Sequence, residues 1–207
     1  MKIIVPELCK KLTALTKKQK EALDKTYSTN EKMIRLISDI LNVAQIEEGK
    51  YISELHSSNI ESVIKSALEG AKEMADKKNV KIEIKTEGKI PGLMIDEGKI
   101  KIALSIVLEN ATEYTAPGGK ITIYLESKWK EIQIKVEDTG YGIPKQEQEK
   151  VFSKFFRGSN VVKIDTEGTG LGLFIAKNII ESHGGKIWFE SEENKGTAFY
   201  ITLPSKS

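Results

Sequence analysis

Asp138-Thr139-Gly140-Tyr141-Gly142-Ile143-Pro144 and, further along, Gly168-Thr169-Gly170-Leu171-Gly172-Leu173 are the two stretches that decide the fold of this chain. Glycine recurs at every second position in both, where the lack of a Cβ lets the backbone come close to a ligand. The charged and aromatic segment between them, residues 145–167, has the length of a lid or binding loop. One carboxylate beside a glycine turn, and a second glycine turn that opens a helix, suit a nucleotide whose base and phosphates are held separately.

The composition is that of an ordinary globular protein. The 207 residues include 32 basic and 30 acidic side chains, which gives a net charge of +2. No bulk electrostatic attraction to nucleic acid or to an anionic membrane follows, so we expect neither as a partner. The single cysteine, Cys9, excludes an internal disulfide and agrees with a reducing compartment. Because no apolar stretch reaches the roughly 18 residues of a membrane span and no signal peptide is present, we expect a soluble cytoplasmic chain.

Residues 1–50 are predicted to form a helical hairpin. Thr16 and Gln19 fit a capping box, apolar side chains then recur every three or four residues, and Gly49 is a suitable stop. The resulting helix has about 32 residues and a length of about 48 Å. Residues 2–14 are expected to form a shorter partner helix. A hairpin with so long an apolar stripe is expected to dimerise into a four-helix bundle, and the alternative is a monomeric hairpin folded back on the second domain.

Residues 51–207 are predicted to form an α+β domain, an α/β sandwich of a mixed sheet with three helices on one face. Alternating apolar and polar positions, bounded by turn residues, predict strands at 52–58, 80–84, 121–125, 132–136, 186–191 and 197–203. Steps of three and four predict helices from residue 60 to about 74, from about 97 to 114, and from the second glycine run to 182. The strands at 121–125 and 132–136 are expected to pair as a hairpin that delivers Asp138 at its end.

Several side chains have both a functional and a structural interpretation. Asn110 has an amide oxygen that can occupy one position on Mg²⁺, although a lone Asn on a helix is more often structural. Asp138 can accept a hydrogen bond from an exocyclic amine and so select adenine, or it can simply cap a turn. Gly168, Gly170 and Gly172 open a helix, where unpaired amides favour anions, but this pattern by itself is a weak signal. The order of these elements along the chain is what favours a nucleotide site.

That order resembles the sensor histidine kinases, whose ATP-binding domain has the Bergerat-type fold shared with gyrase, Hsp90 and MutL. The matching segments are residues 108–115 (the N box), 136–144 (the first glycine box), 151–157 (the F box), 168–173 (the second glycine box) and 196–197 (the last glycine motif). Residues 30–37 and 42–49 resemble the second helix of the family's dimerisation hairpin. The resemblance covers residues 16–204. It implies a cytoplasmic location, either as a separate protein or as the inner part of a membrane-bound sensor.

The resemblance implies that the chain binds Mg·ATP and transfers the γ-phosphate to a histidine, from which it passes to the receiver domain of a response regulator. Asn110 would coordinate Mg²⁺ and Asp138 would bind the adenine amine. The other implied nucleotide-binding residues are Tyr114 beside the nucleotide, Gly140 and Gly142 where the backbone approaches the base, Ile143 as an apolar wall, Gly168, Thr169, Gly170, Leu171 and Gly172 around the phosphates, Thr197 near the base, and Arg157 as a phosphate or stem contact.

Three departures from the family pattern are present. Ile106 stands where the family commonly has an asparagine one turn before the magnesium ligand, and Glu113 stands where it commonly has a basic residue. A carboxylate at position 113 would oppose a triphosphate if it faced the site. The phosphoacceptor box is absent, since His56 and His183 are the only histidines and neither lies on the helical stem. We therefore predict no catalytic residue here and a fragment cut inside the first helix, which cannot phosphorylate itself; a natural pseudokinase is the alternative.

Three functions remain after these observations. The first is the catalytic portion of a protein-histidine kinase, which acts on a histidine supplied elsewhere. The second is a nucleotide-binding scaffold that pairs with a kinase or regulator and transfers nothing. The third is a hydrolysing ATPase of the gyrase or Hsp90 type, which needs a glutamate base at the position of Ile106, and we rank it last.

Overall fold

The structure is a computed structural model that describes residues 16–49, 54–159 and 168–205. The chain divides into two compact units, with the boundary between Leu41 and Asn42. The partner helix predicted at residues 2–14 lies outside the described residues. The assignment of residues 1–50 to dimerisation and of 51–207 to ATP binding stays a prediction.

The long first helix is present as α2 (Lys17–Glu47). The capping box forms as predicted: the backbone N–H of Thr16 donates to Oε1 of Gln19 at 2.9 Å, and the N–H of Gln19 donates to Oγ1 of Thr16 at 3.4 Å. Gly49 has a φ of 64°, the left-handed conformation expected just after a helix. None of the helices that the structure describes has the apolar stretch that a membrane span needs.

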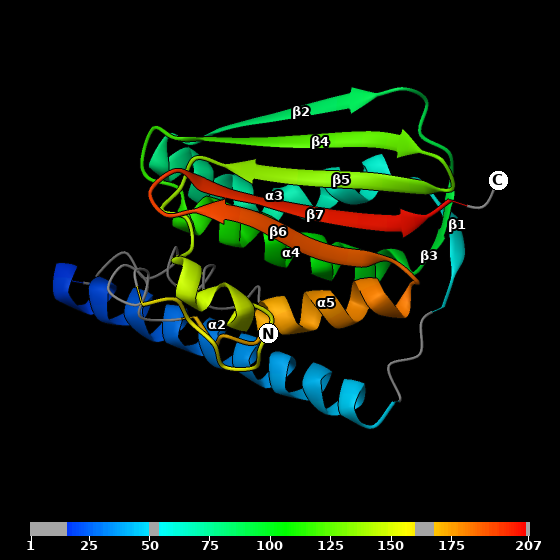
Figure 1. Cartoon of the computed structure of the whole chain (residues 1–207). Helices are drawn as coiled ribbons and strands as arrows, with labels where there is room; N and C mark the ends of the chain where they lie inside the picture. Colours follow the sequence, from blue (N-terminus) through cyan, green and yellow to red (C-terminus); the bar gives the residue numbers. More distant parts are fainter. Residues whose placement is uncertain (1–15, 50–53, 160–167, 206–207) are drawn as a thin grey trace. The chain divides into compact units, whose positions relative to one another are not determined.

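The centre of the second unit is a five-stranded mixed sheet in the order β2-β4-β5-β7-β6 (Figure 1). Its strands are β2 (Lys81–Glu87), β4 (Lys120–Lys128), β5 (Glu131–Asp138), β6 (Lys186–Glu192) and β7 (Gly196–Pro204). β2 runs parallel to β4, and every other neighbouring pair is antiparallel. The hairpin predicted between residues 121 and 136 is confirmed as β4 and β5, with Lys130 at a φ of 60° in the turn.

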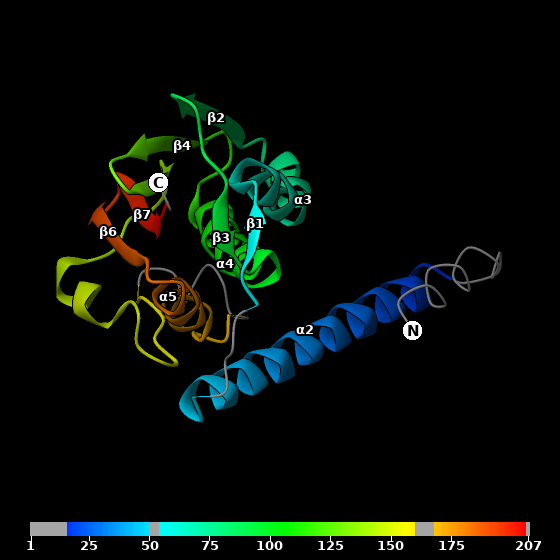
Figure 2. The same ribbon diagram turned by 90° about the vertical axis from the view of Figure 1, so that its right-hand side faces the viewer.

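Three helices cover one face of this sheet (Figure 2): α3 (Ile60–Lys78), α4 (Glu97–Tyr114) and α5 (Gly172–Ser182). α4 packs against both α3 and α5. The largest fully buried side chains belong to one hydrophobic core: Ile60, Ile64, Leu93, Ile95, Ile100, Leu104, Leu108, Ile121, Ile123, Leu125, Ile132 and Ile134. The predicted α+β sandwich, of the Bergerat type, is therefore confirmed.

Two short elements were not predicted, and one strand is shorter than expected. A strand was predicted at residues 52–58, of which 52 and 53 lie outside the described residues. Within the described part, only β1 (His56–Ser58) forms a strand. β1 pairs antiparallel with β3 (Leu93–Ile95), which sequence periodicity did not indicate. A 3-10 helix, η1 (Lys145–Lys150), opens the segment between the glycine runs.

Candidate nucleotide-binding site

Asp138 is a buried carboxylate at the end of β5. Alternation along this strand turns Ile132, Ile134 and Val136 toward the core, and Asp138 continues the same series with 6% of its surface exposed. Its Oδ1 accepts hydrogen bonds from the backbone N–H of Gly140 at 2.8 Å and of Thr197 at 3.2 Å. Two strand ends thus orient the carboxylate, and both of these bonds end on the same oxygen.

The environment of Asp138 disfavours its negative charge. Burial raises the pKa of this carboxyl to about 6, while the hydrogen bonds from Gly140 and Thr197 act in the opposite direction and Glu137 adds a smaller upward effect. A carboxylate kept in such a place, with one oxygen already held by backbone amides, is suited to accept a donor from a ligand on its second oxygen. The exocyclic amine of adenine is a donor of this kind.

The two glycines of the first run are required by close contacts with the protein's own backbone. A Cβ on Gly140 would lie 2.3 Å from the carbonyl oxygen of Tyr114, at the end of α4. Gly142 has a φ of 64°, and a Cβ there would lie 2.0 Å from the carbonyl oxygen of Glu192. The loop is fastened at the same points, because the N–H of Tyr141 donates to the Tyr114 carbonyl at 3.1 Å. These glycines therefore hold the Asp138 loop against α4 and β6, and their predicted approach to a base stays a prediction.

A hydrogen-bond network fixes Ile143 and Thr197, the residues predicted to lie near the base. The backbone N–H of Ile143 donates to Oγ of Ser191 at 2.9 Å, and this hydroxyl lies 2.9 Å from Oγ1 of Thr197. The side-chain amide of Gln148 donates to the carbonyls of Ile143 and Ser191 at 3.1 and 3.0 Å. Sequence reasoning missed Ser191 and Gln148, because Ser191 lies more than forty residues from both Ile143 and Gln148 in the chain.

The second glycine run leads into α5 as predicted. Leu171 is buried at the N-cap and provides no side-chain hydrogen bond to the first turn, in contrast to Asn59 and Asp96, which cap α3 and α4. Backbone amides at such a helix start favour an anion. Gly170 has a φ of 68°, and a Cβ there would meet the backbone of Phe155 at 2.7 Å. The run is therefore packed against the segment that follows η1.

Asn110 and Tyr114 lie in the last turns of α4, and both are half-buried. Ile106 lies one turn earlier and faces the start of α5, where a Cβ on Gly172 would approach its Cγ2 to 3.1 Å. Within the described residues no group of three or more His, Cys, Asp or Glu side chains is arranged to hold a metal ion. Asn110 would give one neutral oxygen to a magnesium ion whose remaining ligands are phosphates and water, and this role stays a prediction.

The lid segment contributes packing as well as candidate contacts. Phe152 packs against Phe189, with ring centroids 5.8 Å apart, and belongs to the edge of the core. Phe155 is 70% exposed and has a φ of 61°, while Arg157 is half-buried. Residues 160–167, the remainder of the predicted lid, lie outside the described residues.

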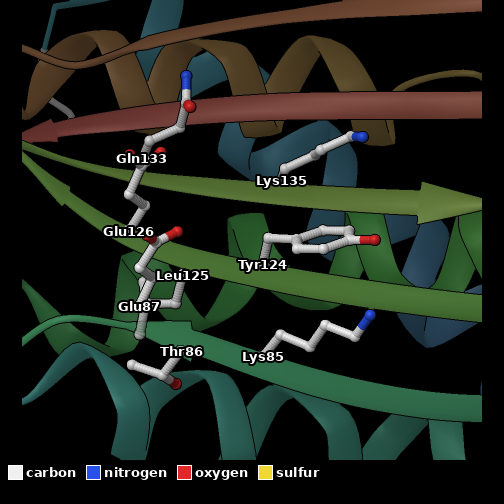
Figure 3. A pocket seen from close by; sticks show the side chains of 8 residues that line it. All are labelled: Lys85, Thr86, Glu87, Tyr124, Leu125, Glu126, Gln133 and Lys135. Carbon is white, nitrogen blue, oxygen red and sulfur yellow. The ribbon is translucent and has the colours of Figure 1, made fainter.

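A shallow hollow of about 430 Å³ lies on the other face of the sheet (Figure 3). Its lining residues are Lys85, Thr86, Glu87, Tyr124, Leu125, Glu126, Gln133 and Lys135. The ammonium groups of Lys85 and Lys135 lie 5.3 and 5.1 Å from the centre of the Tyr124 ring, and Lys135 also pairs with Glu137 at 2.9 Å. Lys135 is thus paired with a carboxylate, Lys85 lies over an aromatic ring, and the hollow is separate from the Asp138 loop.

Comparison with known proteins identifies the family of the domain that carries this candidate site. Residues 95–207 match the family of histidine kinase-, DNA gyrase B- and HSP90-like ATPases. The sensor histidine kinase WalK of Bacillus subtilis (strain 168) is 35% identical over 184 residues, 87% of this chain and 30% of WalK. The nucleotide-free catalytic domain of histidine kinase ThkA is 34% identical, with a TM-score of 0.64 over 73% of this chain and 95% of that domain. ThkA in complex with the response regulator protein TrrA gives 29% identity and a TM-score of 0.69 over 98% of this chain and 57% of that one.

The fold and the site define a Bergerat-type ATP-binding domain. The chain belongs to the histidine kinase-, DNA gyrase B- and HSP90-like ATPase family, and it contains the catalytic ATPase domain of a sensor histidine kinase. The chain spans about 30% of the length of WalK. The family assignment therefore applies to the ATPase domain, and the activity and partners of a whole kinase remain proposals for this chain.

Proposed function

We propose that this chain binds Mg·ATP and transfers the γ-phosphate to a histidine, from which it is relayed to the receiver domain of a response regulator. The observation that carries the proposal is the buried Asp138 carboxylate, whose Oδ1 is held by two backbone N–H groups. Its second oxygen is the acceptor for the adenine amine. The similarity to ThkA, which has been solved with the regulator TrrA, supports the regulator as the partner. A cytoplasmic location follows from such a partner.

The other residues of the site act on the remaining parts of the nucleotide. Asn110 supplies an amide oxygen to Mg²⁺, and the amides of residues 168–172 bind the phosphates at the start of α5. Tyr114, Ile143 and Thr197 surround the base, and Arg157 reaches a phosphate. Hydrolysis is disfavoured, because Ile106 has no group that can take a proton from water and its side chain lies against Gly172.

Calorimetric titration with ATP and GTP in the presence of Mg²⁺ tests the proposal. We expect ATP to bind at least about tenfold more tightly, because guanine presents a carbonyl oxygen where adenine presents the amine that Asp138 accepts. Two acceptors would then face each other in the GTP complex. Equal affinities for ATP and GTP would contradict this assignment of Asp138.

The same carboxylate predicts a pH dependence. Oδ1 accepts two backbone hydrogen bonds, so a proton added to Asp138 goes to the second oxygen and turns the acceptor for adenine into a donor. Since the pKa of Asp138 in the folded chain without ligand is about 6, ATP affinity is expected to fall as the pH drops below that value. It should be about tenfold lower near pH 5 than near pH 8. Titrations across this range measure it, with thermal unfolding in the same buffers to confirm that the chain stays folded. A level affinity would contradict the prediction.

We also propose that the chain forms a homodimer through its N-terminal helical region. Met33, Ile37 and Leu41 on α2 are 58%, 55% and 58% exposed, which is unusual for apolar side chains in series on one helix. We expect light scattering to report a dimer at tens of micromolar. Ile37→Asp should weaken dimerisation at least about tenfold, since it buries a charge in the interface. Ser28→Asp, which adds the same charge to the opposite face of α2, is the matched control. A monomeric wild type would contradict the prediction.

A further inference from the structure

Lys78, the last residue of α3, contacts the end of the helix that carries the proposed nucleotide ligands. Its ammonium donates hydrogen bonds to the carbonyl of Glu113, to that of Thr112 at 3.1 Å and to that of Thr115 at 3.4 Å. α4 has no basic residue of its own in its last turn. Lys78 therefore supplies, from a different helix, the positive charge that favours a helix C-terminus.

This helix end is also where the Asp138 loop, which follows β5, is attached. The carbonyl of Tyr114 accepts from the N–H of Tyr141 and lies in close contact with Gly140. The carbonyls that Lys78 contacts belong to the residues on either side of Tyr114. A displacement of the last turn of α4 would therefore move the loop that orients Asp138.

Lys78 also interacts electrostatically with Glu113, whose negative charge would oppose a triphosphate bound at this end of α4. Partial burial of the ammonium lowers the pKa of Lys78, and the negative charge of Glu113 acts in the opposite direction. An attraction between the two groups follows, and it is stronger here than between fully solvated charges. Lys78 thus compensates a carboxylate that stands where related kinases commonly have a cation.

We propose that Lys78 is a positioning residue of the nucleotide site: it fixes the last turn of α4 and offsets the Glu113 carboxylate, so that the site accepts a triphosphate. This inference rests on the proposed function. Its charge component predicts a graded effect when Lys78 is removed, because the repulsion between the Glu113 carboxylate and the ligand grows from adenosine to ADP to ATP. A purely structural role would instead weaken all three ligands alike.

The test is calorimetric titration of the full chain with adenosine, Mg·ADP and Mg·ATP. Lys78→Met should weaken adenosine binding about threefold, because the displaced turn of α4 moves the Asp138 loop, and ATP binding at least about tenfold, because repulsion from Glu113 is added. Lys78→Arg keeps the charge and should bind ATP within about threefold of wild type. The matched control is Lys77→Met: Lys77 is an exposed neighbour paired with Glu73 within α3, and its loss should leave all three affinities unchanged.

A second variant tests the charge pairing without removing the lysine. Glu113→Gln should tighten ATP about threefold in the wild-type background, and in the Lys78→Met background it should recover most of the lost ATP affinity. Equal losses for all three ligands without recovery by Glu113→Gln, or unchanged ATP binding by Lys78→Met, would overturn the inference. If the wild type itself fails to bind ATP, the proposed function fails instead, so the two failures are distinguishable.

Discussion

An Asp138→Asn variant is expected to bind ATP at least about tenfold more weakly than the wild type, and to unfold at no lower temperature. The asparagine oxygen can still accept the hydrogen bonds from Gly140 and Thr197, so the loop keeps its geometry. The amide nitrogen then stands where the second carboxylate oxygen was. It presents a donor to the adenine amine, which is also a donor, and the pairing is lost.

The expected stability follows from the raised pKa of this carboxyl, about 6 in the folded chain. A carboxyl whose folded pKa lies above its unfolded value binds its proton more tightly when folded, so ionisation costs stability above about pH 6. That cost, on the order of 3 kcal/mol, is relieved as the pH falls toward about 4. Asparagine carries no charge, and near pH 8 the variant avoids the cost altogether.

Calorimetry and thermal unfolding near pH 8 measure both effects on the same samples. Thr139→Ser, which keeps the hydroxyl that accepts from the N–H of Lys120 on the exposed side of the same loop, is a suitable control and should bind ATP like wild type. An Asp138→Asn chain that binds ATP normally would show that the carboxylate does not contact the base. A variant that loses both binding and fold would point to a structural role alone.

Local sequence signals predicted most of the second unit. The long periodic segments and the strongly alternating ones became α3, α4, α5 and the sheet strands, because each pattern continues over more than one turn or pleat. β3 spans Leu93–Ile95, and three residues carry no measurable period. Its strand conformation depends on pairing with β1, thirty-seven residues earlier, which no local pattern encodes.

The candidate site, like the fold, was predictable from the sequence only in part. Asp138 could be placed at the end of a strand because the alternation of β5 runs directly into it. The glycines could be recognised as close-approach positions, but sequence alone does not tell whether a ligand or the protein approaches. For Gly142 the observed neighbour is the carbonyl of Glu192. Contacts such as those of Lys78 with α4 join residues more than thirty positions apart and became visible only in the structure.

The two histidines of the chain lie far from the proposed phosphate site. His183 is buried at the C-terminal end of α5, whereas the glycine run precedes the N-terminal end of that helix. Its Nε2 accepts from the N–H of Asp96 at 3.1 Å, and its Nδ1 lies 2.7 Å from the carbonyl of Ile179. Both ring nitrogens are therefore engaged by backbone groups, and the side chain acts as a link between α5 and the start of α4.

His56 is also at the wrong end of α4. It pairs with Ile95 in β1–β3, next to the N-cap of this helix, while Asn110 lies 14 positions beyond Asp96 along the same helix. At 1.5 Å per residue this separates the N-cap from the proposed magnesium ligand by about 20 Å. In-line transfer requires the acceptor nitrogen at about 3–3.5 Å from phosphorus. Neither histidine of one chain can reach the proposed phosphate site of the same chain.

We therefore expect this chain, incubated with labelled Mg·ATP, to acquire no acid-labile phosphate. A chain lengthened at its amino terminus by a helix that carries a phosphoacceptor histidine should become labelled, which serves as the positive control. In that longer chain Asn110→Ala should abolish the signal, because the metal that neutralises the transferred phosphoryl group loses its protein ligand. Failure of the lengthened chain to become labelled despite normal ATP binding would favour a nucleotide-binding scaffold over a kinase. Strong labelling of the present chain that maps to His56, and that disappears in His56→Gln, would instead mean that a second copy presents this exposed histidine to the site.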